Sequence, residues 1–249
     1  MIPPTINLLA LTATATVTTR RKIHRILGMK DPVIIAMSPD KANMSYWVKE
    51  RGTVEEVFAP LAAKLRNERT RMSRVIIFCR RCEDCASIYS FFLSIMKHEF
   101  TEPISAPNVS KFRLVDMYTS VTQKEVQERI VKSFSCATAS LRIVISTIAF
   151  GMGIDCAAVT QVIHWRPSAD MESYMQECGR AGRNSQSSSA IIYVKKLDLS
   201  NKTPSEEMKK YCVEQQMCRH SILYSYFDCS TTQVIVLVVH VVTFVQRTV

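Results

Sequence analysis

Glycine is scarce in this sequence: only six of its 249 residues are glycine. None of them completes a Gly-x-x-x-x-Gly frame followed by Lys-Ser or Lys-Thr, which excludes a Walker A phosphate-binding loop from this chain. The acidic strings Asp-Glu-x-His and Asp-Glu-x-Asp are missing as well. Four of the six glycines nevertheless fall within residues 151–182. Glycine concentrated in this way marks backbone that turns sharply or approaches a ligand, so we expect functional residues there.

Acidic residues are outnumbered, with 22 Asp and Glu against 32 Lys and Arg, and the net charge is +10. Such a chain attracts polyanions, which leaves nucleic acid and an anionic membrane surface as alternatives. The nine cysteines are an odd number, which favours a reducing compartment over a disulfide framework. A basic signal-peptide region is absent, and we expect the start to be a cut inside a longer protein. The apolar run 234–245 is shorter than the roughly 20 residues of a membrane-spanning helix.

From Met44 onward, apolar β-branched runs alternate with segments of helical periodicity. This alternation predicts an α/β fold with a parallel sheet and helices on both faces. Ligands bind such a sheet beyond the carboxyl ends of its strands, and both glycine clusters adjoin strand ends. The predicted strands are 45–50, 74–79, 112–118, 141–147, 160–165 and 190–194, and the predicted helices are 53–68, 82–97, 122–134 and 169–181.

The N-terminal part is predicted to be separate from this sheet. It should contain strands at 6–11 and 31–37 on either side of one helix. Thr18 or Thr19 would cap that helix, and Gly28 would end it. Turn-forming residues at 38–43 suit a linker between domains.

The string QECGRAGR, residues 176–183, is the sharpest chemical signal. Gln176, Arg180 and Arg183 stand at helical spacing, so one face of a helix end would carry two guanidinium groups and an amide. Planar guanidinium groups on a surface thinned by glycine suit bidentate contact with phosphates. The alternative is a solvated basic helix end with ordinary salt bridges, and the glycines favour the phosphate site.

A second signal is STIAFGMGID, residues 146–155. Thr147 ends a predicted strand and could hold a nucleic-acid phosphate, while Gly151 and Gly153 would let the loop approach it. Asp155 is positioned to accept a hydrogen bond from a ribose hydroxyl. A tight strand-to-loop turn is the alternative, and the spacing to QECGRAGR favours the binding loop.

Four segments in this order, ALTATAT, RVIIFCRR, STIAFGMGID and SYMQECGRAGR, resemble motifs III to VI of the RecQ family of superfamily 2 DNA helicases. The resemblance covers about residues 8–198. It implies two RecA-like lobes with ATP between them, single-stranded or forked DNA across their top, and 3′-to-5′ translocation. The implied parts are a remnant of lobe 1 at 1–42, the RecA-like C-terminal lobe at 43–198, the helical start of a zinc-binding subdomain at 199–230, and an atypical apolar tail at 231–249.

The resemblance also implies roles for individual residues. Thr12 and Thr14 would link the nucleotide state to the DNA surface, and Thr147 would touch the DNA backbone. Arg180 and Arg183 would face the ATP phosphates, with Arg183 as the arginine finger. The full implied set is Gln176, Arg180 and Arg183 for catalysis, Gly151, Gly153, Asp155, Arg180 and Arg183 for ATP, and Thr12, Thr14, Thr119 and Thr147 for DNA.

ATP hydrolysis also needs the lysine, Mg²⁺ ligand and glutamate that the resemblance assigns to the rest of lobe 1. The chain alone is therefore expected to lack ATPase activity. A non-catalytic nucleic-acid-binding or interaction module derived from lobe 2 is the rival interpretation. The family implies a role in DNA repair or recombination, in the nucleus or in the cytoplasm of a bacterium, without a membrane.

Three departures from the family pattern bear on these roles. Asn184 and Ser185 replace an acidic residue and glycine, which affects how Arg183 is anchored, and Thr119 stands where histidine is usual. The zinc-ligand cysteines are incomplete, since Cys218 and Cys229 have the expected context but no further cysteine follows. Cys212 and His220 could complete a zinc site, and buried or stray thiols are the favoured alternative.

Overall fold

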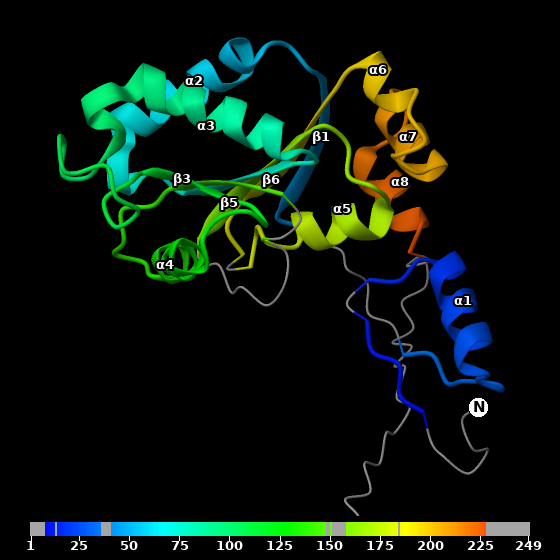
Figure 1. Cartoon of the computed structure of the whole chain (residues 1–249). Coiled ribbons are helices and arrows are strands. Elements are labelled where there is room, and N and C mark those ends of the chain that lie inside the picture. Colours follow the sequence, from blue (N-terminus) through cyan, green and yellow to red (C-terminus); the bar gives the residue numbers. More distant parts are fainter. Residues whose placement is uncertain are drawn as a thin grey trace, which may run out of the picture. The chain divides into compact units, whose positions relative to one another are not determined.

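The computed structural model describes residues 8–12, 14–35, 41–147, 150, 158–183 and 185–227 (Figure 1). The chain forms two compact units, one of residues 1–40 with 220–249 and the other of residues 41–219. None of the helices in the described part of the chain has the length and apolar character that a membrane span requires. The apolar run 234–245 lies outside the described residues.

The larger unit is built on a six-stranded sheet in the order β1-β6-β5-β2-β4-β3, and every strand pairing is parallel. This confirms the predicted parallel α/β fold. The strands are β1 (Met44–Glu50), β2 (Arg74–Cys79), β3 (Val115–Tyr118), β4 (Ile143–Ser146), β5 (Val159–Trp165) and β6 (Ser188–Val194).

Strand β3 begins three residues later than predicted because its predicted start has another partner. Arg113 forms an isolated antiparallel bridge with Thr101. On either side of that bridge, the Glu102 N–H donates to the Phe112 carbonyl and the Leu114 N–H donates to the Phe100 carbonyl. The apolar run 112–118 is therefore divided between a short antiparallel contact and the parallel sheet.

Helices cover both faces of the sheet, as predicted. Figure 1 shows α2 and α3 on one face and α4 and α5 on the other. A capping box starts α2, since Thr53 Oγ1 accepts from the Glu56 N–H and Glu56 Oε2 accepts from the Thr53 N–H. The helices of this unit are α2 (Val54–Glu68), α3 (Cys82–Met96), α4 (Lys124–Ser135), α5 (Met171–Cys178), α6 (Lys196–Leu199) and α7 (Glu206–Val213), with 3-10 turns at Arg69–Arg71 and Lys97–Phe100.

The central strands are buried on both faces, which explains their continuous apolar sequence. All six residues of β2 are buried. Under α2 and α3, strand residues such as Ile77 and Ile163 pack with Phe58 and Phe92. On the other face, the Phe134 ring contacts Phe150 at 5.7 Å between centroids. These two cores fix the strand ends, where the candidate functional residues lie.

The smaller unit contains α1 (Val17–Leu27) and most of α8 (Arg219–Ser225). Thr16 caps α1 by accepting from the Thr19 N–H at 3.2 Å, so the predicted cap at Thr18 or Thr19 is wrong by two or three residues. Gly28 ends α1 with φ +62°, as predicted. The strands predicted at 6–11 and 31–37 are wrong for their described parts, because residues 8–11 and 31–35 pair with no strand.

Candidate functional site

Basic or hydroxyl-bearing residues follow every strand at the carboxyl edge of the sheet. Arg80 and Arg81 after β2 and Lys195 after β6 are exposed. These exposed cations give the edge a positive surface that suits an anionic polymer. The residues that directly follow the six strands are Arg51, Arg80, Thr119, Thr147, Arg166 and Lys195.

Thr119 and Thr147 lie next to each other at this edge, because Tyr118 of β3 pairs with Ser146 of β4. Ser146 Oγ donates to the Tyr118 carbonyl at 2.6 Å and joins the two strand ends. The Thr147 side chain is half-buried, and its hydroxyl has no hydrogen-bond partner within the described part of the chain. Thr147 can therefore offer a hydroxyl to a ligand.

The structure corrects the role expected of Thr119. Its side chain is fully buried, and its hydroxyl lies 3.1 Å from the Thr122 hydroxyl. The Thr119 N–H donates to Thr122 Oγ1, and Gln127 Nε2 donates to the Thr119 carbonyl. The Thr119 hydroxyl is thus not available to DNA in this structure, and the residue shapes the turn after β3.

Two carboxylates fix Arg51 and Arg166 at the carboxyl edge. Arg166 has φ +112°, and its guanidinium pairs with Asp84 at 2.8 Å and with Asp198 at 2.5 Å. Arg51 pairs with the same Asp198 at 2.9 Å. Burial alone would raise the pKa of Asp198, but hydrogen bonds from the Lys195 N–H and Arg51 outweigh it and hold the pKa below its ordinary value.

The arginine segment at residues 179–183 lies beyond a helix rather than on one. Helix α5 ends at Cys178, three residues before the predicted end, so the predicted single helical face is wrong for Arg180 and Arg183. Gln176 is exposed on the last turn of α5. Arg180 is half-buried in the following turn, and Arg183 is exposed.

Residues from the start of the larger unit hold this turn and explain why the helix stops. Lys41 Nζ donates to the carbonyls of Gly179 at 3.1 Å and Ala181 at 2.8 Å. Asn43 Nδ2 donates to the Gly182 carbonyl at 3.1 Å. Carbonyls at a helix end need such partners, and here two side chains distant in sequence supply them. Lys41 and Asn43 had no recognisable signal in the sequence beyond their turn-forming segment.

Gly182 is required by close packing against the start of β1. Its φ is +68°, and a Cβ there would stand 2.9 Å from Asn43 Nδ2 and 3.1 Å from Met44 Sδ. The sequence suggested that this glycine thins the surface for a phosphate. The structure shows instead that it lets the arginine turn approach the sheet.

A buried polar network anchors the arginine turn to β5. Glu177 Oε2 accepts from Ser168 Oγ at 2.5 Å and lies 2.9 Å from His164 Nε2. His164 is 1% exposed and Glu177 is 6% exposed. His164 also stacks on Phe78, with 5.6 Å between the ring centroids. Glu177 stands within the motif QECGRAGR, but the motif gives no sign of this network, because His164 and Ser168 lie outside it.

The arginine turn ends at the amino edge of the sheet, where the Gly182 N–H donates to the Val159 carbonyl at the start of β5. The expectation that both glycine clusters lie at the carboxyl edge is therefore wrong for this cluster. The physical reason is that the chain runs back along β5. Glu177 lies beside His164 near the carboxyl end of the strand, and Gly182 lies beside Val159 at its amino end. Thr147 and Arg183 consequently belong to opposite edges.

Positive charge gathers at this amino edge. Burial, followed by the nearby charge of Arg183, lowers the pKa of Lys41 below its ordinary value of 10.5. The Lys41 ammonium donates to carbonyl oxygens, which do not cancel its charge. Arg180 lies between Gly179 and Ala181, whose carbonyls Lys41 binds. The positive charges of Lys41, Arg180 and Arg183 suit the negative charge of a phosphate chain.

Several predicted residues cannot be compared with these edges. Gly151, Gly153, Asp155 and Cys229 lie outside the described residues. Thr12 and Thr14 belong to the smaller unit, where Thr12 Oγ1 donates to the Thr14 carbonyl at 2.8 Å.

The described residues do not assemble a zinc site. No group of three or more metal-ligating His, Cys, Asp or Glu side chains occurs among them. Burial raises the pKa of Cys212 to about 12, which opposes the thiolate that zinc requires, and Cys218 is exposed. The zinc site at Cys218 and Cys229 therefore stays a prediction.

The comparison with protein families agrees with this geometry. The model of the helicase conserved C-terminal domain matches residues 56–185, just over half of the chain. The chain belongs to this helicase C-terminal domain family. The matched region contains Thr147 at the carboxyl edge and the arginine turn at the amino edge.

RecQ helicases are among the curated relatives of this helicase domain. It is 29% identical to the ATP-dependent DNA helicase Q1 of Rattus norvegicus over 236 residues, covering 90% of the chain and 35% of the relative. It is 27% identical to the ATP-dependent DNA helicase RecQ of Haemophilus influenzae over 241 residues, covering 90% of the chain and 35% of the relative. The chain thus spans about a third of these relatives' length. Its RecQ-like character, expected from the motifs, is confirmed.

Solved helicase structures share the fold. S. cerevisiae Dbp5 bound to RNA and ADP BeF3 superposes with a TM-score of 0.59 at 16% identity, over 88% of this chain and 49% of that chain. Mycobacterium smegmatis helicase Lhr bound to ssDNA and AMP-PNP gives 0.56 at 19% identity, over 76% and 24%. These similarities confirm the RecA-like fold of the helicase domain.

Proposed function

We propose that this chain supplies the second RecA-like lobe of a RecQ-like, ATP-dependent 3′-to-5′ DNA helicase. The observation that carries the proposal is the helicase C-terminal domain match over a fold that presents cations at two opposite sheet edges. The division of the chain into a lobe 1 remnant at 1–42, lobe 2 at 43–198 and the start of a zinc-binding subdomain at 199–230 is part of this proposal.

The amino edge would receive the phosphates of ATP. Arg183 is exposed there beside Lys41, and Lys41 holds the turn through two carbonyls. A guanidinium at this place would neutralise charge as the γ-phosphoryl group leaves. Arg180 would bind the same phosphates, while Gln176, exposed one turn earlier, would orient them. ATP and Mg²⁺ would supply the phosphoryl chemistry together with the rest of lobe 1.

The carboxyl edge would carry the DNA backbone. Thr147 offers a hydroxyl, and Arg80, Arg81 and Lys195 offer exposed positive charge. Contacts of this kind position a nucleic-acid backbone without reading its sequence. With phosphates of ATP at one edge and DNA at the other, movement of this lobe would couple hydrolysis to translocation along single-stranded or forked DNA.

The test joins this chain to a lobe 1 that contains a Walker A loop and measures DNA-stimulated ATP hydrolysis. Arg183→Ala should reduce turnover by about 10³-fold or more, because an arginine finger contributes about 10³ to 10⁵ in rate. ATP binding should be retained. Arg71→Ala, which removes an exposed arginine elsewhere at the amino edge, serves as the matched control.

Arg183→Lys separates the guanidinium geometry from the charge alone, and it should remain well below the parent rate. Equal turnover by Arg183→Ala and the parent would reject the finger assignment. DNA binding without any ATP hydrolysis in the joined protein would instead favour the non-catalytic module.

A further inference from the structure

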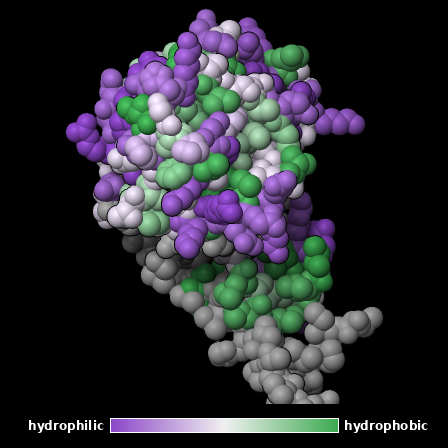
Figure 2. All heavy atoms as spheres, turned by 60° about the vertical axis from the view of Figure 1, so that its left-hand side comes forward, coloured by the Kyte–Doolittle hydropathy of each residue, from purple (hydrophilic) through white to green (hydrophobic). Residues whose placement is uncertain are grey.

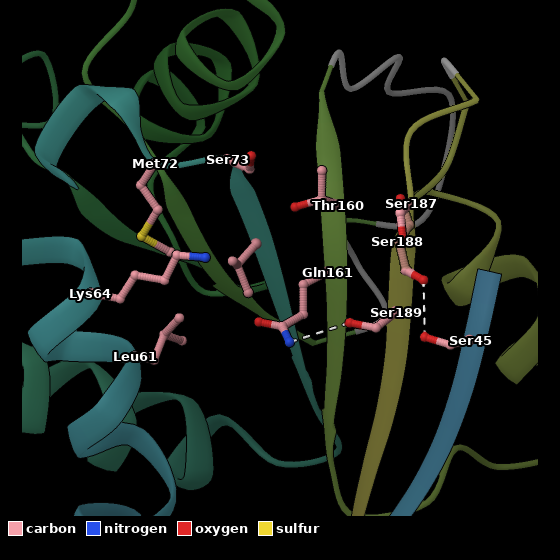
Figure 3. A pocket seen from close by; sticks show the side chains of 11 residues that line it. Ser45, Leu61, Lys64, Met72, Ser73, Thr160, Gln161, Ser187, Ser188 and Ser189 are labelled. Carbon is pink, nitrogen blue, oxygen red and sulfur yellow. Dashed lines mark hydrogen bonds between the residues drawn. The ribbon is translucent and has the colours of Figure 1, made fainter. Parts of the chain in front are cut away.

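A polar pocket of about 230 Å³ lies between α2 and the amino ends of β1, β2, β5 and β6 (Figure 3). At roughly 30 Å³ per water molecule, this space corresponds to about eight waters, which suits a small polar molecule. Its lining contains six hydroxyl side chains, one amide and one lysine, and it contains no carboxylate. The polar lining residues are Ser45, Lys64, Ser73, Thr160, Gln161, Ser187, Ser188 and Ser189.

The strand register shows that three of these polar residues form a row across neighbouring strands. Ser45, Ser189 and Gln161 stand side by side on β1, β6 and β5. Two residues further along the same face, the corresponding row is Trp47, Ile191 and Ile163. Ile163 and Ile191 are buried, whereas Ser45 and Trp47 are exposed and Gln161 and Ser189 are half-buried. The polar row therefore lies where the face under α2 opens to solvent, within reach of a dissolved ligand.

Several polar groups of the pocket are uncommitted. Lys64 has no hydrogen-bond or ion-pair partner within the part of the chain that the structure describes, and the hydroxyls of Thr160 and Ser187 have none there either. Figure 3 shows the Lys64 side chain extending from α2 toward the strands. By contrast, Gln161 Nε2 donates to Ser189 Oγ at 3.3 Å, which holds the floor of the pocket in place.

We propose that this pocket binds a small phosphorylated polyol, with Lys64 on the phosphate and the hydroxyl row on the polyol. One cation without a neighbouring acid suits a single phosphate group. Hydroxyls that both donate and accept suit the hydroxyls of the polyol. Arg183 is not among the residues that line the pocket, although Ser187 is four residues further along the same segment. This inference does not depend on the proposed helicase activity.

The test measures binding of glycerol 3-phosphate to the full chain by calorimetry, without nucleotide or DNA. Saturable binding is expected, with weaker binding of inorganic phosphate and none of glycerol. Lys64→Gln should weaken glycerol 3-phosphate about tenfold or more, as expected for a lost hydrogen bond to a charged group. Thr160→Val should weaken it by a smaller factor, about threefold to tenfold, because it removes a hydrogen bond to a neutral hydroxyl. Lys132→Gln, an exposed lysine on α4, is the matched control and should bind like the parent.

Thermal unfolding of each variant confirms that the fold is retained, and amide chemical shifts report whether Ser187, Ser188 and Ser189 respond to the ligand. Absent saturable binding, or equal affinity in the parent and Lys64→Gln, would overturn the proposal. Displacement of glycerol 3-phosphate by single-stranded DNA through Lys64 would overturn it too, since the occupant would then be a nucleic-acid backbone. None of these outcomes bears on ATP hydrolysis.

Discussion

Arg51 and Arg166 at the carboxyl edge and Lys41 at the amino edge are held in different ways. At the carboxyl edge, Asp198 neutralises Arg51 and Arg166 together, and Asp84 adds a second carboxylate to Arg166. At the amino edge, Lys41 donates to backbone carbonyls instead. Carboxylates fix a guanidinium but cancel its charge, whereas carbonyls fix an ammonium and leave the charge in place.

This difference separates structural cations from those available to a ligand. The paired arginines at the carboxyl edge stabilise strand ends, and the exposed Arg80, Arg81 and Lys195 provide the positive surface there. Figure 2 shows one face of the molecule, where hydrophilic and hydrophobic side chains are interspersed on the surface. The number of basic residues in the sequence therefore does not give the charge that a sheet edge offers to a ligand. That charge depends on which of these residues pair with carboxylates in the fold.

The largest expected effect concerns the network that fixes the arginine turn to β5. Glu177→Ala should lower the free energy of unfolding by about 3 kcal/mol or more, because Ser168 and His164 would lose their common buried partner. Chemical denaturation of the full chain measures this loss. Glu177→Gln keeps one acceptor oxygen and should lose less stability. Glu125→Gln, at an exposed position of α4, is the control. Equal stability of Glu177→Ala and the parent would show that the network does not anchor the turn.

Gly182→Ala tests the close approach at the amino edge. A Cβ there meets Asn43 and Met44 in a left-handed backbone conformation, so we expect a loss of about 2 kcal/mol. Gly28→Ala is the matched control, since Gly28 has φ +62° with no atom within 4 Å of the added Cβ. Its smaller loss would isolate the contribution of crowding. A loss at Gly182 no greater than that at Gly28 would contradict the packing argument.

Sequence patterns predicted the sheet well because its central strands β2 and β4 are fully buried and continuous in apolar sequence. The segment 74–79 matches β2 residue for residue, and Thr53 begins α2 as a capping residue should. The pattern failed where a segment divides between two partners, as at 112–114. It also failed for 8–11, whose apolar sequence finds no strand partner among the described residues.

The sequence identified which residues belong to the site more reliably than it predicted where they lie in the fold. Arg180 and Arg183 were identified from their spacing, but their location depends on Lys41, which is 138 residues distant from Gly179 in sequence. Thr119 was assigned to DNA because of its motif position, but it is fully buried and its hydroxyl lies against that of Thr122. Such contacts have no periodic signature, and only the folded chain reveals them.

Asp198→Asn tests the carboxylate control of the carboxyl edge through its pH dependence. The folded-state pKa of Asp198 is lowered, so its stabilisation is present above the unfolded value of about 3.8 and is lost as pH falls through the folded value. The variant should be less stable than the parent by about 1 kcal/mol at pH 7. The difference should shrink toward zero below pH ~3.8 in urea titrations. A difference that is constant with pH would exclude the ionised carboxylate as its source.

The smallest expected effect compares one arginine from each end of β2. Arg81 follows the strand at the carboxyl edge and Arg71 precedes it at the amino edge, and both are exposed. If DNA lies along the carboxyl edge, Arg81→Gln should weaken single-stranded DNA binding a few-fold and reduce the slope of log affinity against log salt by about 1. Arg71→Gln removes the same charge and should leave the slope unchanged. Because the two variants have equal net charge, a slope reduced equally in both would mean that DNA responds to the overall field of the chain rather than to one edge of the sheet.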